Sequence, residues 1–307
     1  MSGLSRAVVI AALAALPLAG SDYLLSLLGF VAAYAIAGLG LVVLAGHGGQ
    51  VSLGQAAFLG VGAYASAILA KHGVALPLGL AAAVLAGSAA GWLASLPARR
   101  LSGLYLAMAT LAFGFLVEEA LTRWETLTGG ARGMVVPSDA YSGAAANYAL
   151  AAVLLALAAS ATARMLDSRL GRSLRAVRDD EQAAEAAGVD AWRAKRTAFV
   201  VSAALTGLAG ALLARQLGVV TPEQFGIHAS IELLMLAFIG GVQRPAGALL
   251  GAAFVVFVPE AIVLLRAGLP EEIARQPGLQ PFAFGLAVVL FVLFAPRGIA
   301  GWLPGRR

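Results

Sequence analysis

Long apolar stretches separated by short polar connections make up most of the chain. A helix needs about 20 apolar residues to cross the hydrocarbon core of a bilayer. Ten stretches are candidate membrane segments. They cover residues 7–20, 24–45, 53–70, 76–97, 104–122, 147–166, 197–214, 228–242, 247–266 and 282–296. The pattern therefore predicts an all-α polytopic bundle of about ten transmembrane segments, some of them broken or short, within a single membrane domain spanning residues 1–307.

The first stretch has two interpretations. It is short, Arg6 precedes it and Pro17 lies near its end, as in a cleaved signal peptide. A single basic residue and the lack of a clear A-x-A cleavage motif favour a retained segment instead.

Residues 167–196 interrupt the apolar pattern with many charged side chains. Inside this polar loop, Asp179 and Asp180 are suited to cap a helix, residues 181–187 favour helix formation, and Gly188 is a natural stop. The sequence predicts a two-turn helix outside the membrane. So short a helix is unstable alone in water, so the rest of the subunit or a partner must hold it. A solvated loop without a partner is the alternative.

Two apolar regions contain breaks. Residues 46–55 are rich in glycine, and residues 231–266 would form a helix of about 54 Å, too long for a core of about 30 Å. Interrupted segments in both halves of a chain indicate a transport site near the midplane, whereas close-packed hairpin turns are the alternative. The candidate residues of the two breaks are Gly49, Gln50, Ser52, Gly54, Gln55, Gly240, Gly241 and Gly247. Among them, Gln50, Ser52 and Gln55 could bond a passing solute, but bonding to a neighbouring helix is the commoner role for such side chains.

Composition and charge support a membrane protein. The chain is 60% hydrophobic and 12% charged, with a mean hydropathy of +0.87, and an ordinary globular domain has about 25% charged residues. Its partner is therefore membrane lipid and not nucleic acid, despite the net charge of +5. With both termini placed in the cytoplasm, 15 of the 21 Lys and Arg residues fall on the cytoplasmic side, as the positive-inside rule requires. Arg172, Arg175 and Arg178 are expected to face anionic headgroups.

The remaining polar residues do not form a catalytic pattern. The three histidines are scattered, cysteine is absent and no phosphate-binding G-x-x-x-x-G-K-[ST] motif occurs, so we expect no metal site, no cofactor and no enzyme activity. Any ATP hydrolysis must come from another chain. Of the carboxylates in apolar segments, Glu232 is expected near the membrane–water interface, and the position of Glu260 is left open. An outer loop is expected to form a compact turn at Thr128, Gly129, Gly130 and Gly133.

Five motifs occur in order between residues 46 and 251. They are Gly49–Tyr64, Leu104–Gly114 with the following Thr128–Gly133, Gly171–Arg178 leading into the predicted helix, Thr197–Ala211, and Gly240–Gly251. Together they resemble the permease of branched-chain amino acid ABC transporters, of the high-affinity M type. Two positions depart from the family pattern. Phe115 stands where an acidic or polar residue is usual, and Ala131 stands where proline is usual.

The resemblance implies a non-catalytic permease subunit in a bacterial inner membrane. Its expected partners are a homologous second permease subunit, two ATP-binding subunits and an extracytoplasmic solute-binding protein. The expected ATPase-coupling helix comprises Asp180, Glu181, Glu185, Ala186, Ala187 and Gly188. The solute stays open among branched-chain amino acids, urea, short amides and aromatic acids. A stand-alone secondary transporter or channel is the alternative function.

Overall fold

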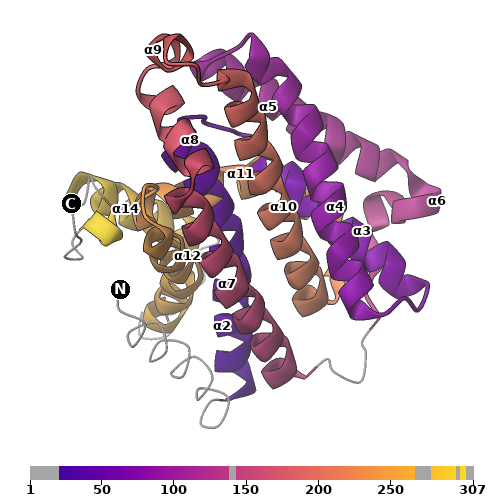
Figure 1. Cartoon of the computed structure of the whole chain (residues 1–307). Helices are drawn as coiled ribbons and strands as arrows, with labels where there is room; N and C mark the ends of the chain where they lie inside the picture. Colours follow the sequence, from indigo (N-terminus) through magenta and orange to yellow (C-terminus); the bar gives the residue numbers. More distant parts are fainter. Residues whose placement is uncertain (1–20, 138–142, 267–277, 295–297, 302–307) are drawn as a thin grey trace.

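Helices run in both directions along a common axis in the computed structural model (Figure 1), which describes residues 21–137, 143–266, 278–294 and 298–301. Six helices among these residues are long and apolar enough to cross a membrane. They are α2 (Asp22–Leu41) with its π-helical extension η2 (Val42–His47), α4 (Leu76–Ser95) with η3 (Leu96–Arg99), α5 (Gly103–Arg123), α7 (Ala144–Asp167), α10 (Ala191–Leu217) and α12 (Pro245–Arg266). The chain is thus an all-α, multi-pass membrane protein.

The centre of the bundle is α10, which packs against α2, α3 (Gln55–Lys71) and α4. Small residues make this close packing possible. A Cβ atom on Gly207 of α10 would lie 2.6 Å from the carbonyl oxygen of Ala83 in α4, and a Cβ on Gly62 of α3 would collide with the Gly207 backbone. Glycine is therefore required where the three helices meet.

A second layer forms on the other side of α2, where α7 and α12 pack. Helix α11 (Ile227–Gly240) lies against α12 through Gly240, Gly247 and Gly251. Helix α14 (Leu279–Phe294) also packs against α12. The short 3₁₀ turn η6 (Ile299–Gly301) ends the described chain.

Helix α11 begins inside the bundle. After α10, strand β2 (Val219–Val220) pairs antiparallel with β1 (Met134–Val135), which precedes α7, and the turn η5 (Pro222–Phe225) leads into α11. Phe225 packs against Gly60 in the middle of α3, and Ser230 Oγ accepts a hydrogen bond of 3.0 Å from the amide of Ala56. At 14 residues, α11 is about 21 Å long and is too short to cross the bilayer alone.

Every predicted segment from 24–45 onward coincides with a helix, and segment 7–20 lies outside the described residues. Since α3 has 17 residues and α11 has 14, the count of about ten membrane crossings is not confirmed and stays a prediction. The 36-residue stretch from 231 to 266 is broken as expected, because α11 ends at Gly240 and α12 begins at Pro245.

Candidate functional site

A polar projection lies at one end of the bundle, formed by α8 (Arg169–Asp179) and α9 (Glu181–Ala186). Ser168 caps α8 by accepting a hydrogen bond from the amide of Leu170, and Asp180 caps α9 by accepting one of 3.0 Å from Ala183. Gly188 ends the turn after α9 with a φ of 84°, in the left-handed region that favours glycine. The predicted short helix is therefore confirmed, including its cap and its stop.

An ion pair holds α9 against α10. Lys195 Nζ donates to the two carboxylate oxygens of Glu181 at 2.6 and 2.7 Å. The Lys195 side chain is 11% exposed and that of Glu181 42%, so solvent screens this pair only in part. Ala184 is the buried residue of α9. Glu181, expected at the coupling surface, thus serves largely to attach the helix to its own subunit.

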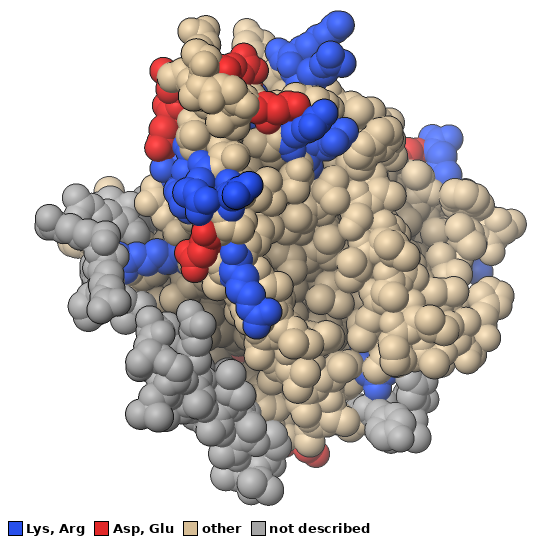
Figure 2. Space-filling view, in the orientation of Figure 1, with Lys and Arg blue, Asp and Glu red and all other residues tan. Residues whose placement is uncertain are grey.

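The outer face of α9 consists mostly of small or uncharged residues and carries few charges. Exposed along it are Asp180, Gln182, Ala183, Glu185, Ala186, Ala187 and Gly188. Figure 2 shows that acidic and basic side chains gather at this end of the molecule, while the side of the bundle below is largely free of charge. This exposed face of residues 182–188 is called the α9 surface below.

The first break lies between η2 and α3. Here Gly48–Gly54 is non-helical, and Gly49 has a φ of 65°. Ser52 accepts a hydrogen bond from the amide of Gly54, and the amide of Leu53 donates to Thr110 Oγ1 of α5 at 3.0 Å. The partly buried loop is therefore joined to α5.

Gln55 and Gln50 have different surroundings. Gln55 is fully buried and donates through Nε2 to Ser202 Oγ of α10 at 3.0 Å, while Thr206 of the same helix donates to its Oε1 at 3.4 Å. Gln50 is 5% exposed, and neither of its amide atoms has a hydrogen-bond partner among the described residues. A buried amide without a partner costs about 1–3 kcal/mol. Gln55 thus joins α3 to α10, whereas the amide of Gln50 is buried without a hydrogen-bond partner among the described residues.

The second break lies at Gly240 and Gly241, where the φ of Gly241 is 101°. Glycine is needed because Gly240 packs against the backbone of Gly247. The two breaks also meet each other, since a Cβ atom on Gly46 would collide with the carbonyl of Val242. Although the breaks are far apart in the sequence, they form one glycine-lined junction, which we call the break junction (residues 46–49 and 241–243).

The arginines of α8 do not simply face headgroups as expected. Arg172 donates to the carbonyl of Asp167 at 3.2 Å and Arg175 to that of Leu166 at 3.0 Å, so both tie α8 to the end of α7. Arg178 donates through Nη1 to the carbonyl of Gly46 at 2.8 Å, at the break junction. The reason is that the helix ends nearby leave backbone carbonyls that accept hydrogen bonds from guanidinium groups.

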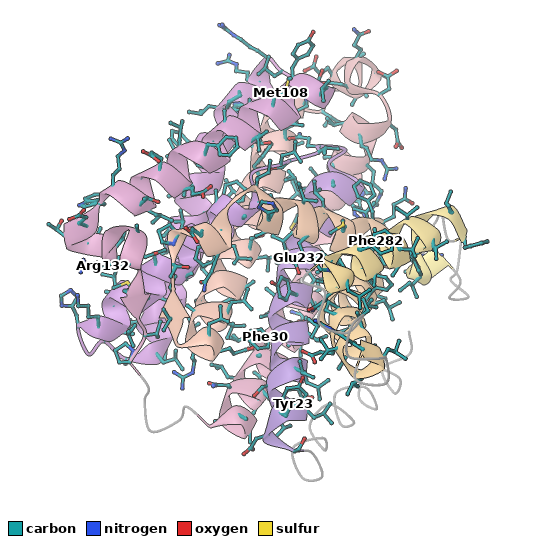
Figure 3. The ribbon with its side chains drawn as sticks, turned by 180° about the vertical axis from the view of Figure 1, so that it is seen from behind. Tyr23, Phe30, Met108, Arg132, Glu232 and Phe282 are labelled. Carbon is teal, nitrogen blue, oxygen red and sulfur yellow. The ribbon has the colours of Figure 1, made fainter. Side chains whose placement is uncertain are left out.

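Glu232 is half-buried on α11, within the bundle (Figure 3), and its expected place near the membrane–water interface stays a prediction. Helix α11 starts beside the middle of α3, and Glu232 lies in its second turn. Glu260 accepts a hydrogen bond of 2.5 Å from the hydroxyl of Tyr23. This bond joins α12 to the start of α2.

The loop after α5 forms a compact turn. Thr128 Oγ1 donates to the carbonyls of Leu121 and Trp124 at 2.6 and 2.7 Å, and it accepts from the amide of Gly130. Gly129, Gly130 and Gly133 all have positive φ angles. The expected ordered turn is therefore present, and in Figure 3 it lies with Arg132 at the end of α5 away from Met108.

Sequence reasoning identified both breaks but not the residues that hold them. Thr110, Ser202, Thr206 and Ser230 are buried and bond to the first break and the start of α3. Their only signal in the sequence was a hydroxyl group in an otherwise apolar segment.

Comparisons with known proteins identify the family of the chain. Residues 23–295 match the family model described as "Branched-chain amino acid transport system / permease component". The chain is 30% identical over 296 residues to the high-affinity branched-chain amino acid transport system permease protein LivM of Salmonella typhimurium, covering 87% of this chain and 67% of that protein. LivM of Escherichia coli matches to the same extent. LivH of Salmonella typhimurium is 26% identical over an alignment of 302 positions that covers 92% of this chain and 92% of LivH.

No solved structure matches the chain significantly. The match to the family model covers most of the chain, and the LivM proteins resemble it over 296 residues. The chain therefore belongs to the family of permease components of branched-chain amino acid transport systems.

Proposed function

We propose that this chain is one of two homologous permease subunits of an ATP-driven importer for branched-chain amino acids or a related small polar solute. Two ATP-binding subunits drive it, and an extracytoplasmic binding protein delivers the solute. The observation that carries the proposal is the α9 surface, a small exposed helix face attached to the central helix α10. Such a surface can dock in a groove on another subunit.

The α9 surface is suited to transmit force because an ion pair fixes α9 to α10 and both helices are capped. Asp180 caps α9, the Glu181–Lys195 pair fixes it to α10, and Asp190 caps the start of α10 by accepting from the amide of Arg193 at 2.9 Å. A pull on α9 is then passed to α10, which packs on α2, α3 and α4. When the ATPase subunits close on ATP, the broken helices rock and access alternates across the membrane.

The remaining partners follow from the family and from the chain's own residues. Both LivM and LivH, each named as a permease protein, are similar to this chain, which supports a homologous second permease subunit. The sequence contains no phosphate-binding motif for ATP, so hydrolysis belongs to separate subunits. The ordered turn at residues 128–133 is the proposed contact for the binding protein.

The proposed location is a bacterial inner membrane with both termini in the cytoplasm. The polar loop 167–196 is then the cytoplasmic coupling loop of a single membrane domain, and 15 of 21 basic residues lie on that side. The names of the relatives favour leucine, isoleucine or valine as solute. Phe115, which departs from the family pattern, is half exposed on α5.

The decisive experiment reverses one charge on the α9 surface. Glu185 is exposed and has no hydrogen bond or ion pair among the described side chains, so Glu185→Arg leaves the attachment of α9 intact. We expect the variant to lose co-purification with the ATPase subunits and to lose leucine uptake. The matched control is Arg169→Glu, which reverses one exposed charge at the start of α8. Normal co-purification and uptake in Glu185→Arg would refute the role of α9.

A stand-alone secondary transporter or channel is the second candidate, favoured by the half-buried carboxylate of Glu232 within the bundle. It predicts uptake by the purified chain alone, driven by an ion gradient. Uptake that requires ATP and the co-purified ATPase subunits would exclude it.

A further inference from the structure

Arg178 is placed between the coupling loop and the break junction. It is the next-to-last residue of α8, and its Nη1 donates to the carbonyl of Gly46 at 2.8 Å, across 132 positions of the chain. Its side chain is 28% exposed. This is a direct bond from the loop that carries α9 to the segment where α2 gives way to the first break.

The aliphatic part of the same side chain packs on Gly49. A Cβ atom on Gly49 would lie 2.6 Å from Arg178 Cγ, and Gly49 has a φ of 65°, so both space and backbone require glycine there. Arg178 therefore contacts the first break at two places, one polar and one apolar. Through these two contacts, a displacement of α8 is passed to the first break.

Asp179 holds the guanidinium in the orientation that reaches Gly46. Its Oδ1 accepts from Arg178 Nε at 2.9 Å and from Nη2 at 2.7 Å, which leaves Nη1 for the carbonyl. Asp179 is followed directly by Asp180, the cap of α9. Only a planar guanidinium has donors for both acceptors at once, so lysine cannot replace arginine here.

The second break is reached through Gly46. The carbonyl of Val242 lies so close that Gly46 cannot carry a side chain. Contacts therefore run without interruption from the cap of α9 through Asp179, Arg178 and Gly46 to Val242. In Figure 1, α8 lies between α9 and the bundle, as this route requires.

We propose that Arg178 is a positioning residue that moves both breaks together with α9 when ATP closes the motor subunits. This inference rests on the proposed function and adds to it the path by which motion of α9 reaches the membrane. Arg172, also on α8, serves as the comparison. Its hydrogen bond goes to the carbonyl of Asp167 at the end of α7 and not to either break.

The first test measures uptake per ATP hydrolysed. The full complex, with both permeases, two ATPase subunits and the binding protein, is reconstituted in vesicles with radiolabelled L-leucine. In Arg178→Ala and Arg178→Lys we expect assembly and ATP hydrolysis to persist while uptake per ATP falls about tenfold, the size of effect expected for one lost charge-assisted hydrogen bond. Arg172→Ala should keep the wild-type ratio. A wild-type ratio in Arg178→Ala overturns the inference, and so does loss of ATPase binding, which would indicate a role in docking only.

The second test needs no solute. The chain contains no cysteine, so pairs of spin labels can be placed at Ala176 on α8, Gln243 at the break junction and Leu85 on α4, all of which are exposed. On trapping the assembled complex with ATP and vanadate, the 176–243 distance should stay narrow and unchanged while the 176–85 distance shifts. In Arg178→Ala the 176–243 distance should broaden or shift. If the wild-type 176–243 distance shifts as much as the 176–85 distance, Arg178 does not link the two.

The two tests separate this inference from the proposed function. A wild-type complex that assembles but takes up no leucine would refute branched-chain amino acids as the solute. The spin-label distances would then decide the role of Arg178. A chain that binds no ATPase subunit would refute the proposed function and this inference with it.

Discussion

Gly207 is the residue whose replacement most directly tests how the membrane core is packed. It faces α3 and α4 at once, and no other residue type fits there without movement of the helices. In Gly207→Ala, the new Cβ would lie 2.6 Å from the Ala83 carbonyl oxygen and 3.2 Å from Gly87 Cα. Both atoms belong to a helix backbone and cannot rotate away, so α4 and α10 must separate.

The magnitude follows from the size of that overlap. Inserting one methyl group into a close-packed core costs about 1–3 kcal/mol, while alanine gains up to about 1 kcal/mol over glycine in helix propensity. The suitable control is Gly285→Ala, since Gly285 is also inside a helix but a Cβ there would meet no atom within 4 Å. The propensity gain cancels between the two variants. Their difference should then be about 1–3 kcal/mol, with Gly207→Ala the less stable.

Thermal unfolding of the purified permease in detergent measures this difference. The fraction that stays monodisperse after heating is read by size-exclusion chromatography. At roughly 2–4 °C per kcal/mol, the midpoint of Gly207→Ala should lie roughly 2–12 °C below that of Gly285→Ala. Equal midpoints for the two variants would refute the close contact of α10 with α4.

Two further predictions concern α9 and the first break. Lys195→Met removes the partner of Glu181, so backbone amides of residues 181–186 should exchange hydrogen faster while those of α10 stay protected; unchanged exchange would show that the ion pair does not hold α9. Thr110→Val keeps the shape of the side chain but leaves the partly buried amide of Leu53 without its hydrogen bond, which should cost about 0.5–1.5 kcal/mol by the same thermal assay. Thr110→Ser should retain most of the stability, and equal loss in both variants would argue against that hydrogen bond.

Features set by neighbouring residues were predictable from the sequence. The cap at Asp180 and the stop at Gly188 were correct because a short helix is delimited by groups a few residues away. The break after Gly240 was also predictable, since an unbroken helix over residues 231–266 would exceed the bilayer. Family membership followed from ordered motifs, and the family match over residues 23–295 agrees with it.

Glu181 shows what the sequence left open. The sequence placed Glu181 on the short polar helix but did not decide whether the subunit itself or a partner holds that helix. In the structure Lys195, which lies 14 positions away, donates to its carboxylate. This contact could not be predicted from the local pattern, because it depends on where a second helix lies.

The sequence by itself determined that the chain is a membrane protein, roughly where its apolar helices lie, and that two of its apolar regions must break, because hydrophobicity, capping and helix length act over a few neighbouring residues. Tertiary structure alone decided that the two breaks touch, that α11 starts in the middle of the bundle, and that Arg178 reaches Gly46. These contacts join residues far apart in the chain. They depend on how closely glycine-rich helices approach, which the order of the amino acids does not state.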